Sequence, residues 1–254
     1  VYTDQASIEE IYNLTSRIKN ETQSNLTITF HVLDDIWTSI KHLEMTRNAK
    51  YMFNYINNQS SLDSESFRHN PHLYAVWNSK PNFIEQTVLE NEFDSQFFVY
   101  TDVGAFRNFA YQDWPDQTFA GELKTYLNDR VLFGQIGRVL QNPNSSTSDF
   151  FQAGFFAGSP RAMNEFADNY YRIHDHLIDT GQFVGKEQKL LNLLTIDSSF
   201  KSKIVSLKVF APYVDCHIGY NEWFFYQTYM ASATRTNCLK NVNKLSSVYL
   251  STFL

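Results

Sequence analysis

The segment from Phe97 to Arg107 limits the fold of this chain more than any other stretch. Five of its first six residues are aromatic, β-branched or both, a pattern typical of a strand that is buried on both faces. The apolar run ends at Asp102, and Gly104 follows two residues later. Because open α/β sheets place ligand-binding groups where strands end, this pattern predicts an α/β fold with a ligand-binding carboxylate at Asp102. The alternative is that Asp102 only caps the turn or helix that follows.

The composition is that of a globular protein and argues against a nucleic-acid partner and a membrane span. The chain has 254 residues, of which 43% are apolar and 19% charged, as expected for one globular domain. Its net charge is −6 and it contains no run of Lys or Arg, so we expect no nucleic-acid partner. No apolar stretch approaches the roughly 18 residues of a membrane-spanning helix, so we expect no membrane span within the chain.

Extended and helical patterns alternate along the sequence. Strands are expected near residues 26–33, 97–102, 131–140, 151–157 and 203–210, and an amphipathic helix is expected over residues 4–18. Strand–helix–strand order favours parallel pairing. We therefore predict one domain over residues 1–254, with a mostly parallel central sheet and helices on both faces. Because Val1–Thr3 resembles the end of a strand, we also expect an N-terminal segment upstream of Val1.

Two later helices have clear start signals. Ser159 and Pro160 supply the N-cap and first turn of a helix that Gly181 is expected to end. A second helix is expected to begin within Gly185-Lys-Glu-Gln188. The N-terminus of a helix gathers backbone N–H donors and positive dipole, so this start suits a phosphate or a carboxylate.

Pro81 and a pair of histidines lead to two further expectations. Pro81 should kink or break the helix around residues 72–84, because the residue before a proline avoids the helical region. A break there would direct Lys80 at a ligand, whereas an ordinary helix would leave Lys80 solvated.

His174 and His176 are two residues apart, which is poor spacing for a metal pair, so both are expected on the surface.

Four segments, in order, resemble motifs of GT-A nucleotide-sugar glycosyltransferases. The resemblance is to HtrL/YibB-like proteins and, more distantly, to glycogenin-type enzymes, and it runs from about residue 1 to about residue 226. The segments are Trp77-Asn-Ser-Lys-Pro81, Tyr100-Thr-Asp-Val-Gly-Ala-Phe-Arg107, Phe151-Gln-Ala-Gly-Phe-Phe-Ala-Gly158 and Phe183-Val-Gly-Lys-Glu-Gln-Lys-Leu-Leu-Asn192. The resemblance implies a GT-A-like fold and the transfer of a hexose from a nucleotide-sugar donor to a hydroxyl acceptor, such as a glycan.

The same resemblance implies roles for individual residues. Asp102 and Glu187 would be catalytic, and Asp102 would also hold the donor's ribose or a bridging metal, with His217 as a second metal ligand. The residues implied to bind the donor are Lys80, Gly104, Arg107, Lys186 and Gln188. Those on the acceptor side are Trp77 and Gly154.

The sequence departs from the family pattern at the metal site. Where most GT-A enzymes have Asp-x-Asp, this chain has Asp102-Val-Gly104, so one carboxylate ligand is absent. Any Mn²⁺ or Mg²⁺ is therefore expected to bind weakly and only together with the donor. The departure also keeps an alternative open, in which the chain is a non-catalytic GT-A-like module that binds a glycan or a protein partner.

Asn-x-Ser/Thr sequons occur at Asn13, Asn20, Asn25, Asn58 and Asn144, where chance predicts roughly three to four. This excess points to the secretory pathway, the Golgi lumen or the extracellular space, with a cytoplasmic location as the alternative. The two cysteines, Cys216 and Cys238, are compatible with a disulfide and equally with two buried thiols.

Overall fold

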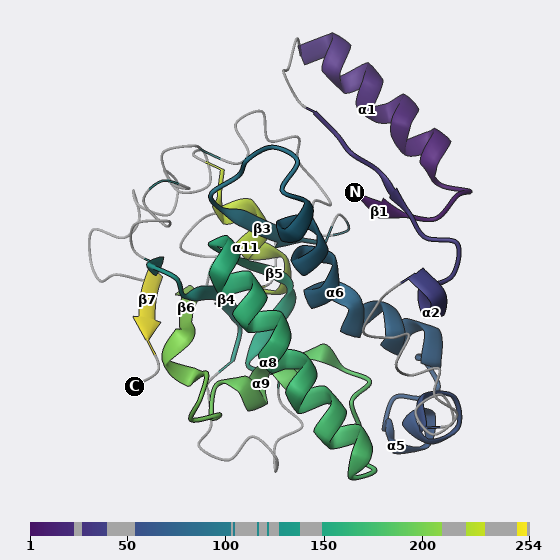
Figure 1. Cartoon of the computed structure of the whole chain (residues 1–254), viewed down its shortest axis with the longest axis vertical. Helices are drawn as coiled ribbons and strands as arrows, with labels where there is room; N and C mark the ends of the chain where they lie inside the picture. Colours follow the sequence, from purple (N-terminus) through teal and green to yellow (C-terminus); the bar gives the residue numbers. More distant parts are fainter. Residues whose placement is uncertain are drawn as a thin grey trace.

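The computed structural model describes residues 1–22, 27–39, 54–102, 104, 116, 121, 127–137, 149–209, 222–231 and 248–252 (Figure 1). The elements are β1 (Tyr2–Thr3), α1 (Ile8–Thr22), β2 (His31–Val32), α2 (Ile36–Ser39), a π-helical turn (Asn54–Gln59), α5 (Ser60–Leu62), α6 (Pro71–Glu90), β3 (Phe98–Thr101), β4 (Val131–Gln135), β5 (Phe151–Gly158), α8 (Pro160–Asp179), α9 (Glu187–Leu194), a 3-10 turn (Lys201–Lys203), β6 (Ile204–Val209), a second 3-10 turn (Glu222–Phe224), α11 (Phe225–Tyr229) and β7 (Val248–Thr252). The chain therefore has an α/β fold, as its sequence predicts.

The main sheet is mixed rather than mostly parallel. Its five strands lie in the order β3-β5-β4-β6-β7. Of these neighbouring pairs, β4–β6 is parallel, whereas β3–β5, β5–β4 and β6–β7 are antiparallel. The prediction of a mostly parallel sheet is thus wrong, because the apolar pattern of a strand reports its burial and not its direction. The structure also adds β7, a strand that the sequence pattern does not predict.

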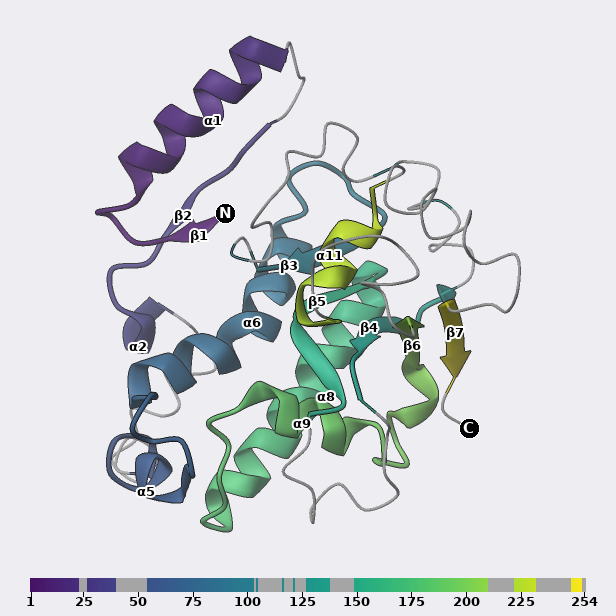
Figure 2. The ribbon, with the colours of Figure 1, turned by 180° about the vertical axis from the view of Figure 1, so that it is seen from behind.

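The strand expected near residues 26–33 does not join the main sheet. Its extended part is β2, which pairs in parallel with β1, so that Tyr2 lies opposite His31 and Thr3 opposite Val32. This two-stranded unit carries α1 and lies beside α6 (Figures 1 and 2). It is anchored there by Tyr2, whose ring stacks on Phe83 and whose hydroxyl donates to the Phe83 carbonyl at 3.0 Å.

Helices cover both faces of the main sheet, as predicted. Val131 and Phe133 of β4 and Ile204 of β6 pack in one core cluster with side chains of α6, α8 and α9. Leu132 and Val205 point the opposite way and pack in a second cluster with side chains of α11. The alternation follows from the two-residue period of a strand. Accordingly, α8 lies in front of the sheet in Figure 1 and α11 in front of it in Figure 2.

The helix α6 continues through Pro81, so the predicted break is wrong. The Asn70 side chain caps its start by accepting the Leu73 N–H, and the helix runs to Glu90. A proline inside a helix costs about 3 kcal/mol, because it removes one backbone hydrogen bond and crowds the preceding turn. Tertiary contacts offset that cost, since the residues around Pro81 are buried and the Tyr171 hydroxyl donates to the Asn78 carbonyl at 2.8 Å.

The start of α8 is confirmed, whereas one of its histidines corrects the sequence analysis. Ser159 accepts the Ala162 N–H as N-cap, and Gly181 follows the helix with a φ of 71°. His176 is exposed, but His174 is buried, bonded through Nε2 to the Tyr55 hydroxyl at 2.5 Å. The helical period places His174 on the buried face of α8, so the expectation of a surface position is wrong for His174 and right for His176.

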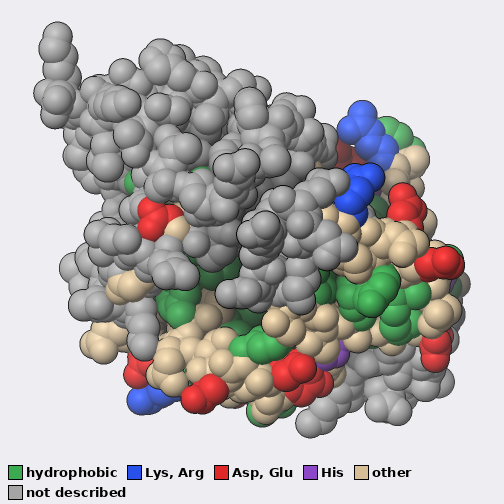
Figure 3. Space-filling model, turned by 90° about the horizontal axis from the view of Figure 1, so that it is seen from above, with side chains coloured by type: hydrophobic (Ala, Val, Ile, Leu, Met, Phe, Trp, Pro, Cys, Tyr) green, Lys and Arg blue, Asp and Glu red, His purple; other side chains and the backbone are tan. Residues whose placement is uncertain are grey.

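The described helices and the surface charge bear on whether a membrane or a nucleic acid is a partner. Among the described helices, none combines the length and the apolar character needed to cross a membrane. On the face seen in Figure 3, the coloured Lys and Arg side chains are scattered and do not form one basic patch.

Candidate active site

A cavity of about 220 Å³ lies at the end of β3 and brings together residues from across the chain. Seven of the residues that the sequence assigns to the site line it: Trp77, Lys80, Asp102, Gly104, Gly154, Glu187 and Gln188. The remaining lining residues are Gln152, Ala153, Trp223 and Phe224. The walls thus come from α6, β3, β5, α9 and the turn before α11.

Lys80 lies at the centre of the polar network. Its Nζ is 2.8 Å from Glu187 Oε1, 3.0 Å from Asp102 Oδ2 and 3.4 Å from the Ala153 carbonyl. Burial lowers the pKa of Lys80, but the carboxylates of Glu187 and Asp102 more than offset burial and raise it above 10.5. An ammonium has three donors and all three are used here, so none is left for the phosphate that the resemblance assigns to Lys80.

Asp102 is held from two sides. Its Oδ2 accepts from Lys80, and its Oδ1 accepts from the Tyr100 hydroxyl at 2.8 Å. The Tyr100 ring stacks on Phe156 with the centroids 4.7 Å apart. Burial, followed by the charge of Asp102, raises the pKa of Tyr100 well above 10, so the phenol stays a hydrogen-bond donor. The Asp102 side chain is 40% exposed, which leaves it open to a ligand in the cavity.

Glu187 is buried, with only 3% of the residue exposed. It begins α9, and Gly185 just before it allows close packing, because a Cβ on Gly185 would lie 2.8 Å from the Tyr74 ring. Glu187 and Asp102, the two residues that the resemblance implies to be catalytic, lie close together, since both bond to the Lys80 ammonium. Within the described residues, Glu187 Oε2 has no hydrogen-bond partner.

A bulge in β5 shapes the wall opposite α6. Phe133 of β4 pairs with Phe156, but the next residue, Gly134, pairs with Gln152, so the register shifts between Phe133 and Gly134. This irregularity lets the Ala153 carbonyl reach Lys80. It also places the Gly154 carbonyl where it accepts the Asp102 N–H at 2.9 Å. Bulges commonly redirect backbone groups beside functional sites, and this one contributes two carbonyls to the network.

Aromatic side chains flank the acidic centre. Trp77 lies on α6, one turn before Lys80, and its ring meets His69 edge to face at 4.9 Å. Trp223 and Phe224, both partly exposed, line the cavity from the turn before α11. A cavity with carboxylates at its centre and indole rings at its edge suits a ligand that has both hydroxyl groups and an apolar face.

Lys186 does not line the cavity but forms a close ion pair with Glu65. The hydrogen bond from Lys186, and then its charge, lower the pKa of Glu65. Glu65 also belongs to a group with Asp63 and His69 whose ligand atoms lie within 4.8 Å of one another, so this group could hold a metal ion. Its acids are already partnered, because Asp63 Oδ2 accepts from both His69 Nδ1 at 2.7 Å and the Tyr74 hydroxyl at 2.8 Å.

The residues around Asp102 do not fit a bridging divalent cation. The Lys80 ammonium lies between Asp102 and Glu187, where such an ion would have to bind, and both Asp102 oxygens already accept hydrogen bonds. The described group that could hold a metal is Asp63, Glu65 and His69 instead. Arg107 and His217, predicted to bind phosphate and metal, lie outside the described residues, as do Cys216 and Cys238.

The described ionisable residues that line the cavity carry a net negative charge. They are Lys80, Asp102 and Glu187, so one positive charge faces two negative ones. Such a centre attracts hydroxyl donors and cations, and it does not by itself attract a diphosphate.

Sequence reasoning did not assign Tyr100, Trp223 or Gln152 to the site. Tyr100 was detectable, because residues two apart on a strand point to the same face, and Tyr100 precedes Asp102 by two. No sequence pattern marks Trp223 as a site residue. It reaches the cavity, which is also lined by Trp77, only because distant segments fold together.

We compared the chain with protein-family models, with curated proteins and with solved structures, and none of the three comparisons found a match.

Proposed function

We propose that this chain is a glycosyltransferase that moves a hexose from a nucleotide-sugar donor to a hydroxyl acceptor. One observation carries the proposal: Asp102 and Glu187 converge on Lys80 in a cavity edged by Trp77 and Trp223. Carboxylates accept strong hydrogen bonds from hydroxyl groups, and indole rings offer an apolar face to a sugar ring.

In the proposed reaction, the carboxylates of Glu187 and Asp102 have different roles. Transfer breaks the bond between the anomeric carbon and the diphosphate, which leaves with the bonding electron pair. It forms a bond to the acceptor oxygen, whose proton passes to the departing diphosphate. The buried Glu187 stabilises the positive charge that develops at the anomeric carbon, because a fixed charge acts strongly in a water-poor site. The more exposed Asp102 orients the sugar by accepting its hydroxyl hydrogens, while Lys80 and Tyr100 hold the carboxylate in place.

A second candidate function is a non-catalytic module that binds a glycan. It is favoured by the net negative charge of the cavity and by the saturation of Lys80, which together leave no described cation in the cavity for a diphosphate. The two functions share the sugar-binding chemistry and differ in whether a nucleotide binds and is released.

Nucleotide binding separates the two functions. A thermal-shift panel of nucleoside diphosphates would be run with and without Mn²⁺. A ligand at one hundred times its dissociation constant adds about 2.7 kcal/mol to the free energy of unfolding, which a shift in Tm reports clearly. Stabilisation by a nucleoside diphosphate supports the transferase, whereas stabilisation by oligosaccharides alone supports the module.

The Glu187→Gln variant tests the role of the carboxylate. We expect release of nucleoside diphosphate from nucleotide sugars to fall by about 10² or more, while the Tm changes little, since a Gln oxygen can still accept from Lys80. Glu165→Gln, on the outer part of α8 and paired with Arg161, is the matched control and should retain activity. Full activity of Glu187→Gln would remove Glu187 from the mechanism.

A further inference from the structure

Residues 182–185, all of which the structure describes, form neither helix nor strand, yet distant side chains hold their backbone. We call them the α8–α9 connection. The Gln182 carbonyl accepts from Gln59 Nε2 at 3.1 Å, and the Val184 N–H donates to Gln59 Oε1 at 2.8 Å. Gln59 is only 1% exposed, so a buried side-chain amide supplies a donor and an acceptor to this part of the connection.

Asn78 of α6 holds the other end of the connection. Its Nδ2 donates to the Tyr74 carbonyl at 2.8 Å, to the Val184 carbonyl at 2.9 Å and to the Gly185 carbonyl at 3.4 Å. Its Oδ1 accepts from the Tyr170 hydroxyl at 2.5 Å. Turning the amide over would place Oδ1 against three carbonyl oxygens, so only this orientation satisfies the buried Asn78.

The bond between Asn78 and the connection lies next to the bond between Lys80 and Glu187. Asn78 precedes Lys80 by two residues on α6. Gly185 precedes Glu187, the first residue of α9, by two residues. The two segments are therefore joined twice, once through the Asn78 amide and once through the Lys80 ammonium. A shift of the connection would move the Glu187 carboxylate relative to Lys80.

Packing limits where the connection can lie. Val184 is fully buried in the core, and the Phe183 ring meets the Tyr74 ring edge to face at 5.7 Å. A Cβ on Gly185 would lie 2.8 Å from the Tyr74 ring, so the backbone passes close to α6. The Phe183 carbonyl accepts from Lys189 at 3.0 Å. A backbone held by packing and by buried hydrogen bonds can fix a functional side chain within a narrow range of positions.

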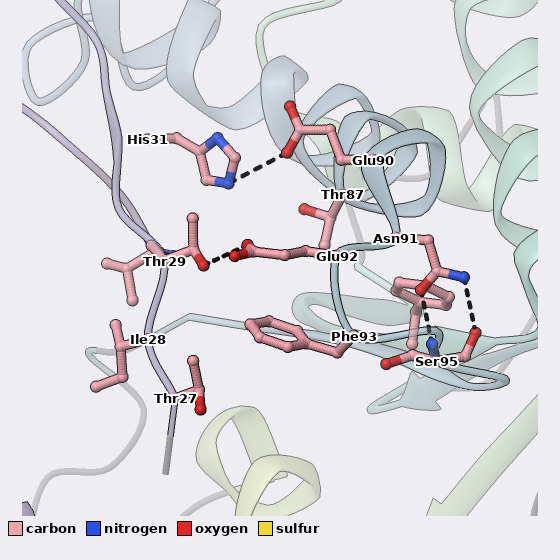
Figure 4. Close-up of a pocket in the computed structure, with 12 residues that line it drawn as sticks. Thr27, Ile28, Thr29, His31, Thr87, Glu90, Asn91, Glu92, Phe93 and Ser95 are labelled. Carbon is pink, nitrogen blue, oxygen red and sulfur yellow. Dashed lines mark hydrogen bonds and ion pairs between the residues drawn. The ribbon is translucent and has the colours of Figure 1, made fainter.

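Another asparagine, at the end of α6, uses its amide differently. Figure 4 shows Asn91 beside a cavity of about 360 Å³, with its Oδ1 accepting the Ser95 N–H at 2.7 Å and its Nδ2 donating to the Ser95 carbonyl at 3.2 Å. These bonds span four residues and close a local turn. The bond from Asn78 to Val184 spans 106 residues. The Asn91 amide thus stabilises its own turn, whereas the Asn78 amide determines where a distant segment lies.

We propose that Asn78 is a positioning residue, which holds the α8–α9 connection against α6 and thereby places the Glu187 carboxylate at Lys80. Gln59 supports the same connection from its other side. The effect of this placement on sugar transfer rests on the proposed function, whereas the placement itself does not.

The reactivity of Lys80 reports the placement of Glu187 without any transferase activity. Acetic anhydride acylates the free amine of lysine, and mass spectrometry would measure the rate at each lysine of the 254-residue chain. Burial lowers the pKa of Lys80, but the charge of Glu187 and then that of Asp102 raise it, so the wild type should react slowly. In Asn78→Ala, we expect Lys80 to react about ten-fold faster, because Glu187 moves away from the ammonium.

Two controls separate positioning from a loss of stability. Asn91→Ala removes the amide at the end of α6 and should destabilise the fold, but its Lys80 should react as in the wild type. In Glu187→Gln, Lys80 already lacks the charge that Asn78 positions. Adding Asn78→Ala to Glu187→Gln should therefore change the Lys80 rate by less than about three-fold.

Turnover links the positioning role to the proposed function. Asn78→Ala should lower kcat for transfer by about ten- to a hundred-fold and change KM by less than about two-fold, because Glu187 acts at the reacting carbon. A wild type without transferase activity would refute the proposed function. The Lys80 rates would still test the positioning role, so the two failures are distinguishable.

Three results would overturn the positioning role. The first is a Lys80 rate in Asn78→Ala no higher than that in Asn91→Ala. The second is an equal increase from Asn78→Ala in the wild-type and Glu187→Gln backgrounds, which a loss of stability would give. The third is a wild-type Val184 amide that exchanges as fast as one in an unstructured peptide, because its bond to Gln59 should slow exchange by about 10² or more. This last measurement stands even if Asn78→Ala does not fold.

Discussion

Replacing Lys80 with Met should destabilise the protein strongly at neutral pH. Met keeps the apolar stem of Lys80 but leaves two carboxylates without their shared cation. Asp102 is 40% exposed and can be solvated, whereas the Glu187 side chain is only 4% exposed. Removing one partner of a buried ion pair costs about 3–5 kcal/mol, and we expect the lower end because only Glu187 is deeply buried. For a chain of this size, about 3 kcal/mol lowers the Tm by roughly 6–12 °C.

The pH dependence of the lost free energy of unfolding shows whether the charge of Lys80 is its cause. In the wild type the pKa of Lys80 is raised, so the stabilisation is fully present below the unfolded-state value of 10.5 and is lost as the pH rises through the folded-state value. Lys80→Met lacks this titrating group, so its deficit relative to wild type should be fully present at pH 7.5 and should shrink at about pH 11, where wild type begins to lose the Lys80 contribution.

Urea unfolding of four proteins at both pH values provides the measurement: wild type, Lys80→Met, Lys189→Met and Lys80→Met with Glu187→Gln. Lys189 lies on α9 and donates to the Phe183 carbonyl at 3.0 Å, so its loss should cost about 1 kcal/mol or less. The double variant has no unpaired buried charge and should recover most of the loss. A deficit below about 1 kcal/mol in Lys80→Met, unchanged at about pH 11, would refute the buried-pair reasoning.

Three further predictions concern other parts of the site and the sheet. Tyr100→Phe should reduce kcat by about ten-fold with little change in Tm, because Asp102 loses one of its two holding contacts; an unchanged kcat would show that the phenol does not position Asp102. Gly134→Ala should destabilise the fold by about 1–3 kcal/mol, since its Cβ would meet the Tyr226 ring at 2.6 Å, whereas Gly104→Ala, with nothing within 4 Å, should leave the Tm unchanged. Calorimetry should find little Mn²⁺ binding at Asp102 without nucleotide, because Lys80 lies in that position; strong binding that Asp102→Asn abolishes would contradict this.

Much of the local structure could be predicted because its causes are local. Ser159 and Pro160 start α8, and the runs at residues 97–102 and 151–157 contain the strands β3 and β5. β5 is buried throughout, whereas β3 is only partly buried, so the expectation that its segment is buried on both faces is wrong. The chemistry-bearing residues also stood out, because Asp102 ends an apolar strand and Glu187 begins a helix. Caps, periodicity and strand ends depend on residues only a few positions apart, so the sequence alone determines them.

The arrangement of these elements was decided only by the tertiary structure. The direction of β5 against its neighbours, the separation of β1–β2 from the main sheet and the continuation of α6 through Pro81 all depend on packing between distant segments. The same is true of the centre of the site, where Lys80 bonds to Glu187 across 107 residues and thereby holds two carboxylates rather than a phosphate. A residue's pattern in the sequence fixes which face it buries, but the partner it meets there is chosen by the free energy of the whole packed fold.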